Sequence, residues 1–213
     1  MIASLTLVLF GSQCHRSNEV VWTKGFTFHH SQQLSSGLVL LTEAGFYSQG
    51  NRDRVRLTWF RHTASGFKNL LAFEGMATLD DLSPKVQGDW VRLRTVDEPH
   101  VLMVSAGDDT FGRDWTWHVE NGIPRLVSRN VLAVRLRAVD QAIWRSWSAR
   151  HPSLLQRNLR KAWPEPDDFF SWTEKRNGAT WTVTLDRDFI FTLRQVGTGE
   201  WKVVDFRTAR KTG

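Results

Sequence analysis

A two-residue hydrophobic period runs along most of this chain and restricts its fold more than any other feature. Val55, Leu57 and Trp59 alternate with polar residues, among them Arg54 and Arg56. Such alternation is typical of a β-strand that buries one face and turns a charged face outward. The further segments that we interpret as strands are 90–96, 101–104, 115–120, 123–127, 170–176, 181–185, 189–193 and 201–206. The pattern predicts a fold dominated by antiparallel strands.

Two Asn-Gly pairs mark turns between these strands. Asn121-Gly122 and Asn177-Gly178 each separate two strand-like segments. Asn-Gly favours hairpin turns whose central residues have positive φ. Pro124 follows the first pair, and because proline lacks a backbone N–H, it indicates that the returning strand lies at a sheet edge.

The period changes to that of a helix between residues 131 and 163. An apolar stripe with spacings of four, three, four and four residues predicts one face of an α-helix; it consists of Leu132, Leu136, Val139, Ile143 and Trp147. His151-Pro152 interrupts the pattern, a second helix is predicted from 153 to about 163, and Pro164 and Pro166 stop it. The chain is therefore predicted to be α+β, with an N-terminal β-rich part, a central helical segment and a C-terminal four-stranded meander.

The helical pair and the meander after it, which closes with G-T-G-E-W-K-V-V-D-F at 197–206, together resemble NTF2-like or cystatin-like α+β folds over about 75 residues. The resemblance concerns the fold alone, since such folds host enzymes and binding proteins alike. We divide the chain into a signal (1–14), a β-rich region (15–128), a helical segment with the meander (129–207) and a disordered basic tail (208–213). The two middle parts form either separate domains or one continuous domain.

The first fourteen residues have the pattern of an export signal. The run 2–10 is apolar but too short to span a bilayer, and it is followed by Gly11, Ser12, Gln13 and Cys14, the single cysteine of the chain. This order resembles a bacterial lipoprotein signal, which implies that Cys14 is lipidated. No Lys or Arg precedes the run. The alternative is that the run forms a buried first strand with a core cysteine nearby.

The positive charge of the protein is concentrated in the helical segment. The formal net charge is +6, and the stretch 135–161 contains seven basic residues against Asp140, whereas the basic and acidic residues elsewhere balance. The candidate residues for binding an anionic surface are Arg145, Arg150, Arg157, Arg160 and Lys161, and the aromatic candidates are Trp144 and Trp163. This pattern fits an anionic membrane surface, a nucleic acid, or a solvated helix face whose tryptophans pack inward.

No motif in the sequence predicts a catalytic residue, a cofactor or a metal site. A single cysteine excludes a zinc site built from several cysteines, and His29 and His30 are neighbours on a predicted strand, where they point to opposite faces. Large inward side chains are expected where the strands alternate, so we assign to the core Trp59, Trp115, Trp117, Trp181 and Trp201.

Together these observations favour an exported bacterial envelope protein that acts as a non-catalytic binding or accessory module, periplasmic or anchored by lipid. Its expected partner is an anionic membrane surface or another envelope component. Two alternatives remain open: a small envelope enzyme with a cleft in the C-terminal α+β unit, and a cytoplasmic nucleic-acid binder that uses the Arg- and Trp-rich helical segment.

Overall fold

The computed structural model describes residues 25–45, 52–97, 99–104, 110–169 and 171–209. It confirms the predicted α+β fold: the strands are mostly antiparallel and form three four-stranded sheets, accompanied by two helices. The predicted signal 1–14, including Cys14, and most of the predicted basic tail lie outside the described residues.

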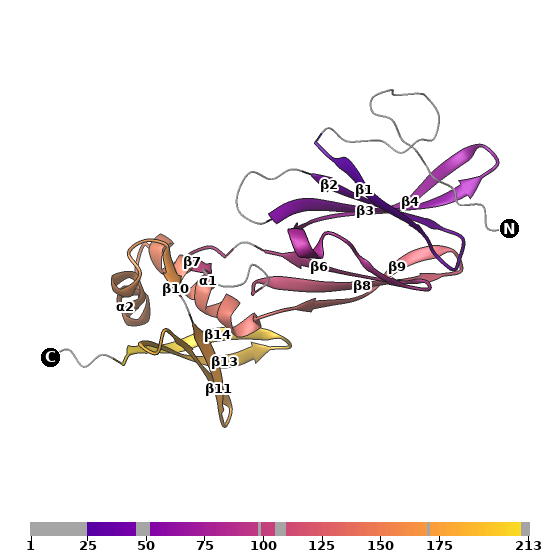
Figure 1. The fold of residues 1–213 in the computed structure, drawn as a ribbon. Coiled ribbons are helices and arrows are strands. Elements are labelled where there is room, and N and C mark those ends of the chain that lie inside the picture. Colours follow the sequence, from indigo (N-terminus) through magenta and orange to yellow (C-terminus); the bar gives the residue numbers. More distant parts are fainter. Residues whose placement is uncertain (1–24, 46–51, 98, 105–109, 170, 210–213) are drawn as a thin grey trace.

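Two of the sheets form an N-terminal sandwich, in which they lie face to face (Figure 1). The first sheet is a meander of β1 (Thr27–Gln33), β2 (Val39–Gly45), β3 (Arg52–Thr63) and β4 (Gly66–Thr78). A short 3₁₀ helix, η1 (Leu79–Asp81), leads to the second sheet, whose order is β5 (Lys85–Gln87), β6 (Trp90–Val96), β8 (Gly112–Glu120) and β9 (Ile123–Val131). β9 is an edge strand, as Pro124 predicts.

The sandwich core is built from the inward faces of both sheets. Val55, Leu57 and Trp59 of β3 are fully buried, and the Trp59 ring lies 5.4 Å from the ring of Trp117 on the opposite sheet. The outer side of β3 differs from the prediction, because Arg56 is only 6% exposed. Its guanidinium donates to Glu74 on β4, so this charge, predicted to face solvent, is a buried member of an ion-pair cluster on the outer side of the sheet.

The C-terminal unit consists of α1 (Val134–Ser148) and α2 (Leu154–Ala162), followed by a third sheet of β11 (Trp172–Asn177), β12 (Thr180–Leu185), β13 (Phe189–Gly197) and β14 (Glu200–Thr208). Ser153 caps α2 in a capping box with Gln156, which explains why the second helix begins there. The predicted α1 stripe is confirmed from Leu136 onward. Leu132 precedes the helix, and its backbone N–H donates to Gly112.

Part of the β-rich region crosses into the C-terminal core. β7 (Leu102–Val104) pairs in parallel with β10 (Asp167–Phe169), and Val101, Leu102 and Phe111 pack in the core formed by α1, α2 and the third sheet. The predicted boundary at 128/129 therefore does not separate the two cores. Within the described part of the chain, neither helix is long and apolar enough to cross a membrane.

The first predicted turn has the expected backbone geometry, whereas the second lies one residue later than predicted. Asn121 and Gly122 between β8 and β9 have φ of 52° and 71°, as a type I′ hairpin turn requires. Between β11 and β12, Asn177 is the last residue of β11 and pairs with Thr180, so the central residues of the turn are Gly178, with φ of 59°, and Ala179. Asp186 and Arg187 adopt positive φ without glycine, and the Asp186 carboxylate accepts the N–H of Ser171 at 2.8 Å.

Candidate functional site

Distant acidic side chains neutralise two of the seven cations in the helical segment. Arg135 of α1 donates to Glu174 of β11, and its guanidinium lies 3.7 Å from the centroid of the Trp181 ring. Arg137 forms an ion pair with Asp97, at 2.9 Å, and burial lowers the pKa of Arg137 while Asp97 opposes that effect. Both arginines hold elements of the fold together, so the exposed excess charge is smaller than the sequence suggests.

A third cation, Arg160, is part of a helix terminus. Its guanidinium donates to the carbonyl oxygens of Ser146, Trp147 and Ala149, at 3.0, 3.2 and 3.1 Å. The last carbonyls of a helix have no intrahelical partner, and a cation there compensates the negative end of the helix dipole. The prediction that Arg160 binds an external anion is therefore corrected: its donors satisfy the end of α1.

The two aromatic candidates have different environments. Trp163 is 3% exposed and packs on Phe189 and Phe206 at 4.5 and 5.9 Å between ring centroids, so its prediction as a binding residue is wrong. Trp144 is 45% exposed, and one face of its indole stacks on His100 at 5.6 Å. Trp144 therefore remains accessible, whereas Trp163 is a core residue.

The outer side of α2 keeps its charge unpaired. Leu154, Arg157 and Lys161 follow one another at spacings of three and four residues, which places them on one side of the helix, and all three are exposed. We call these three residues the α2 face. Arg157 donates to the carbonyl of Pro152 at 3.0 Å, which draws its guanidinium toward the connection that carries Arg150. Among the residues that the structure describes, none of these cations forms an ion pair.

Arg145 lies elsewhere, beside a hollow of about 560 Å³ between α1 and the turn that joins β13 to β14. This hollow lies in the C-terminal α+β unit, where the enzyme alternative places a cleft. Two carboxylates line it: that of the exposed Glu200 and that of the buried Asp140. Oδ1 of Asp140 accepts the N–H groups of Val101 and Leu102, and its Oδ2 accepts that of His100. Both oxygens hold the strand segment in place, so the group is engaged in the fold and poorly suited to act as a base.

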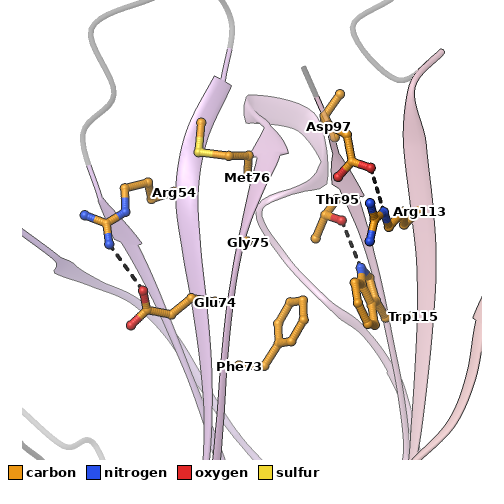
Figure 2. Close-up of a pocket in the computed structure, with 10 residues that line it drawn as sticks. Arg54, Phe73, Glu74, Gly75, Met76, Thr95, Asp97, Arg113 and Trp115 are labelled. Carbon is orange, nitrogen blue, oxygen red and sulfur yellow. Dashed lines mark hydrogen bonds and ion pairs between the residues drawn. The ribbon is translucent and has the colours of Figure 1, made fainter. Parts of the chain in front are cut away.

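A second hollow, of about 600 Å³, opens between the two sheets of the sandwich (Figure 2). Arg113 and Asp97 line it from the second sheet, with Nε and Oδ2 2.6 Å apart. Arg54 and Glu74, with Nη2 and Oε2 3.2 Å apart, lie at its rim on the outer side of the first sheet (Figure 2). We call this hollow the sandwich cleft. Between the two sheets lie Phe73 and Trp115, whose ring centroids are 4.8 Å apart.

Sequence reasoning missed the sandwich cleft because four strands contribute to it. β3, β4, β6 and β8 each supply residues, and no local spacing joins them. Strand alternation predicts that Trp115 belongs to the core; it does pack against the sandwich core, but it is half-buried and also lines the cleft. Alternation predicts which side of a strand a tryptophan occupies, but not how much of its surface the opposite sheet covers.

A buried charge cluster lies on the outer side of the first sheet. Glu43 of β2 is 1% exposed, its Oε2 lies 3.8 Å from Nη1 of Arg56, and its Oε1 has no hydrogen-bond partner. Desolvation raises the pKa of Glu43 above its ordinary value of 4.5, while Arg56 opposes that shift and Glu74 adds to it. The ionised carboxylate is therefore a cost to the folded state.

We expect Glu43→Gln to reduce the loss of stability with rising pH. A carboxyl group whose pKa is raised on folding binds protons more tightly in the folded state, so the free energy of unfolding falls as the pH increases from below 4.5 toward neutrality. Urea denaturation of the variant and the wild type from pH 4.5 to 7 measures this, and the variant should gain relative stability across that range. A constant difference at every pH would contradict the expected titration.

No protein-family model matches the chain, and no curated protein matches it. Among the described residues, no group of three or more His, Cys, Asp or Glu side chains is arranged to hold a metal ion.

Proposed function

We propose that this protein is a non-catalytic module that binds the anionic headgroups of a lipid bilayer through the α2 face. The observation that carries the proposal is the position of Leu154, which is 66% exposed on the same side of a short helix as the unpaired cations Arg157 and Lys161. An exposed aliphatic side chain beside basic residues is the pattern of a segment that lies in a membrane interface.

The expected binding free energy is that of a reversible contact between the α2 face and a bilayer. A basic side chain near an anionic bilayer contributes about 1 kcal/mol, so Arg157 and Lys161 of the α2 face, with Arg150 in the connection that precedes α2, together contribute about 3 kcal/mol. Insertion of Leu154 adds about 1.5–3 kcal/mol when its side chain leaves water completely. Salt screens the ionic part over a Debye length of about 8 Å at physiological ionic strength, so binding should weaken as salt is added.

We also propose that the protein resides in the bacterial cell envelope with Cys14 lipidated. The support is the resemblance of residues 1–14 to a lipoprotein signal. A single acyl chain gives only marginal membrane attachment, and a basic patch supplies the second attachment that stable anchoring requires. An α2 face that binds anionic lipid would therefore complement a lipid at Cys14.

The alternatives lose their main supports. The nucleic-acid interpretation needs aromatic rings on which bases stack, but Trp163 is buried and one face of Trp144 is covered by His100. The enzyme interpretation needs a free acid or base in the C-terminal hollow; Asp140 already accepts three backbone amides there, so this alternative rests on Glu200 and the imidazole of His100. Neither alternative has a specific observation in its favour.

The triple variant Arg150→Gln, Arg157→Gln and Lys161→Gln is expected to bind anionic vesicles about 100-fold more weakly than the wild type at low salt, since about 3 kcal/mol is lost. Co-sedimentation of the full chain with phosphatidylcholine vesicles that contain phosphatidylglycerol measures this. The matched control is Lys68→Gln, Lys85→Gln and Arg92→Gln, which removes the same charge from exposed positions on the sandwich.

The control variant should retain most of the affinity of the wild type. Equal losses in the two triple variants would mean that net charge, and not the α2 face, causes binding. No binding of the wild type to anionic vesicles, together with α2-dependent binding to single-stranded RNA, would favour the nucleic-acid alternative.

A further inference from the structure

The strand registers define which side chains face the sandwich cleft from the first sheet. On β4, Gly75 and Phe73 lie opposite Val55 and Leu57 of β3, and both of these β3 side chains are fully buried between the sheets. Residues directly opposite each other on neighbouring strands share a face of the sheet. Phe73 and Gly75 therefore face the second sheet.

The second sheet presents Trp115 and Arg113 to the same space. On β8, Trp115 lies opposite Leu93 and Arg113 lies opposite Thr95, and Leu93 and Thr95 are buried. Side chains two positions apart on a strand point to the same side. Arg113 and Trp115 therefore line the cleft from between the sheets (Figure 2).

Phe73 and Trp115 form an aromatic base for the cleft. Their ring centroids are 4.8 Å apart, and the indole N–H of Trp115 donates to Oγ1 of Thr95 at 2.9 Å, which fixes the orientation of the indole. A Cβ at Gly75 would lie 2.7 Å from Cγ2 of Thr95, so the glycine permits β4 to approach β6 at this point. Both aromatic side chains are half-buried, so part of their carbon surface is accessible.

A single carboxylate, that of Asp97, serves two guanidiniums above this base. Its Oδ2 accepts from Nε of Arg113 at 2.6 Å and from Nη1 of Arg137 at 2.9 Å. The other two nitrogens of Arg137 donate to the carbonyl oxygens of Leu132 and Gly112, at 3.0 and 3.1 Å. Every nitrogen of the Arg137 guanidinium therefore has a partner within the fold.

Arg113, in contrast, has donors to spare. Its side chain is 33% exposed, and within the described residues Nη1 and Nη2 form no hydrogen bond. Burial lowers the pKa of Arg137, and the positive charge of Arg113 lowers it further, while Asp97 opposes both effects. The two cations therefore repel each other across a shared carboxylate, and an anion bound at Arg113 would relieve that repulsion.

We propose that the sandwich cleft binds a small aromatic carboxylate at Arg113. Nη1 and Nη2 offer two parallel N–H donors, which match the two oxygens of a carboxylate, and Phe73 and Trp115 offer a surface for the attached ring. The volume of about 600 Å³ is within the range of small-ligand pockets, about 300–1,000 Å³. The cleft is lined by the N-terminal sandwich alone, so this site is independent of the α2 face (Figure 1).

A monocarboxylate suits these charges better than a dianion or a neutral ligand does. Asp97 lies beside Arg113, so a dianion such as phosphate meets about twice the repulsion that a monoanion meets. A neutral ligand leaves the excess charge without a counter-ion. Arg129, which is exposed and has no ion pair in the described chain, lies 5.8 Å from the centroid of the Trp115 ring and adds positive potential beside the aromatic base.

The test is saturation-transfer difference NMR of the full chain with benzoate and phenylacetate at low salt. Benzamide is the neutral isostere of benzoate, and inorganic phosphate is added as a competitor without a ring. We expect at least one of the two carboxylates to bind with a Kd of about 1 mM or lower. Benzamide should bind about tenfold more weakly than benzoate or worse, and an equal concentration of phosphate should displace little of the bound carboxylate.

The variant Arg113→Gln should weaken carboxylate binding by about tenfold or more, because hydrogen bonds to a charged group are lost. The matched control is Arg94→Gln, which breaks an ion pair between the same two strands: Nε of Arg94 lies 2.7 Å from Asp114, the Arg94 side chain is 37% exposed, and strand alternation places it on the opposite face from Arg113. The control should bind as the wild type does. The α2 triple variant should also bind normally, so failure of the lipid proposal and failure of this one can be told apart.

Four results would each overturn the assignment. They are the absence of binding by both carboxylates, equal affinities for benzoate and benzamide, displacement of the carboxylate by an equal concentration of phosphate, and equal binding by Arg113→Gln and Arg94→Gln. The comparison of benzoate with benzamide uses the wild-type protein, so it decides the question even if Arg113→Gln does not fold.

Discussion

Asp140→Ala is expected to lower the free energy of unfolding by about 3–5 kcal/mol. The Asp140 carboxylate is 3% exposed and accepts three backbone N–H groups from residues 100–102, at 2.8, 2.8 and 3.0 Å. Val101 and Leu102 are themselves buried, so water cannot replace the lost acceptor. The variant would leave buried donors unsatisfied and loosen the segment that joins the two cores.

Urea denaturation of Asp140→Ala against Asp114→Ala measures this effect. Asp114 pairs with Arg94 at 2.7 Å, but the side chains are 38% and 37% exposed, so the control should cost no more than about 1 kcal/mol. Equal costs for the two variants would contradict the role of Asp140 as the anchor of residues 100–102.

Trp163→Ala is expected to cost about 3–5 kcal/mol, because it removes a large buried ring from the C-terminal core. Trp163 contacts Phe189, Phe191 and Phe206, and its carbonyl accepts the indole N–H of Trp147 at 2.6 Å. Trp144→Ala is the matched control, since Trp144 is 45% exposed and should cost far less. Thermal and urea denaturation of both variants measure the difference.

A milder substitution at the same position distinguishes a structural role of Trp163 from a role in binding. Trp163→Phe retains most of the buried ring, and we expect it to bind anionic vesicles as the wild type does. A loss of vesicle binding in a folded Trp163→Phe protein, with no change in stability, would restore Trp163 as a binding residue. A small stability cost for Trp163→Ala would contradict its placement in the core.

The parts of the fold that depend on local chemistry could be predicted from the sequence. Alternation in β3, the Asn121-Gly122 turn and the α1 stripe from Leu136 onward each reflect neighbours along the chain. The parallel pairing of β7 with β10 could not be predicted in this way. This pairing joins residues about sixty positions apart, and no sequence pattern in either segment predicts which strand it pairs with.

The candidate site was predicted in part, for a similar reason. The sequence identified the basic segment, but exposure depends on partners that come from far away. Glu174 and Asp97 engage two of the arginines, and the end of α1 engages Arg160. Arg157 and Lys161 stay exposed because their side of α2 packs against nothing in the described chain. Leu154, which carries the functional proposal, had no signal beyond its position at the start of a helix.

The most direct test of the α2 face is the environment of residue 154 in the presence of membrane. In a Cys14→Ser background, Leu154→Cys labelled with the polarity-sensitive fluorophore NBD would be compared with Val127→Cys, a position on β9 that is 53% exposed. Anionic vesicles should shift the emission of the label at 154 to shorter wavelength and leave the label at 127 unchanged. No shift at 154, or the same shift at both positions, would contradict the proposal that α2 enters the lipid interface.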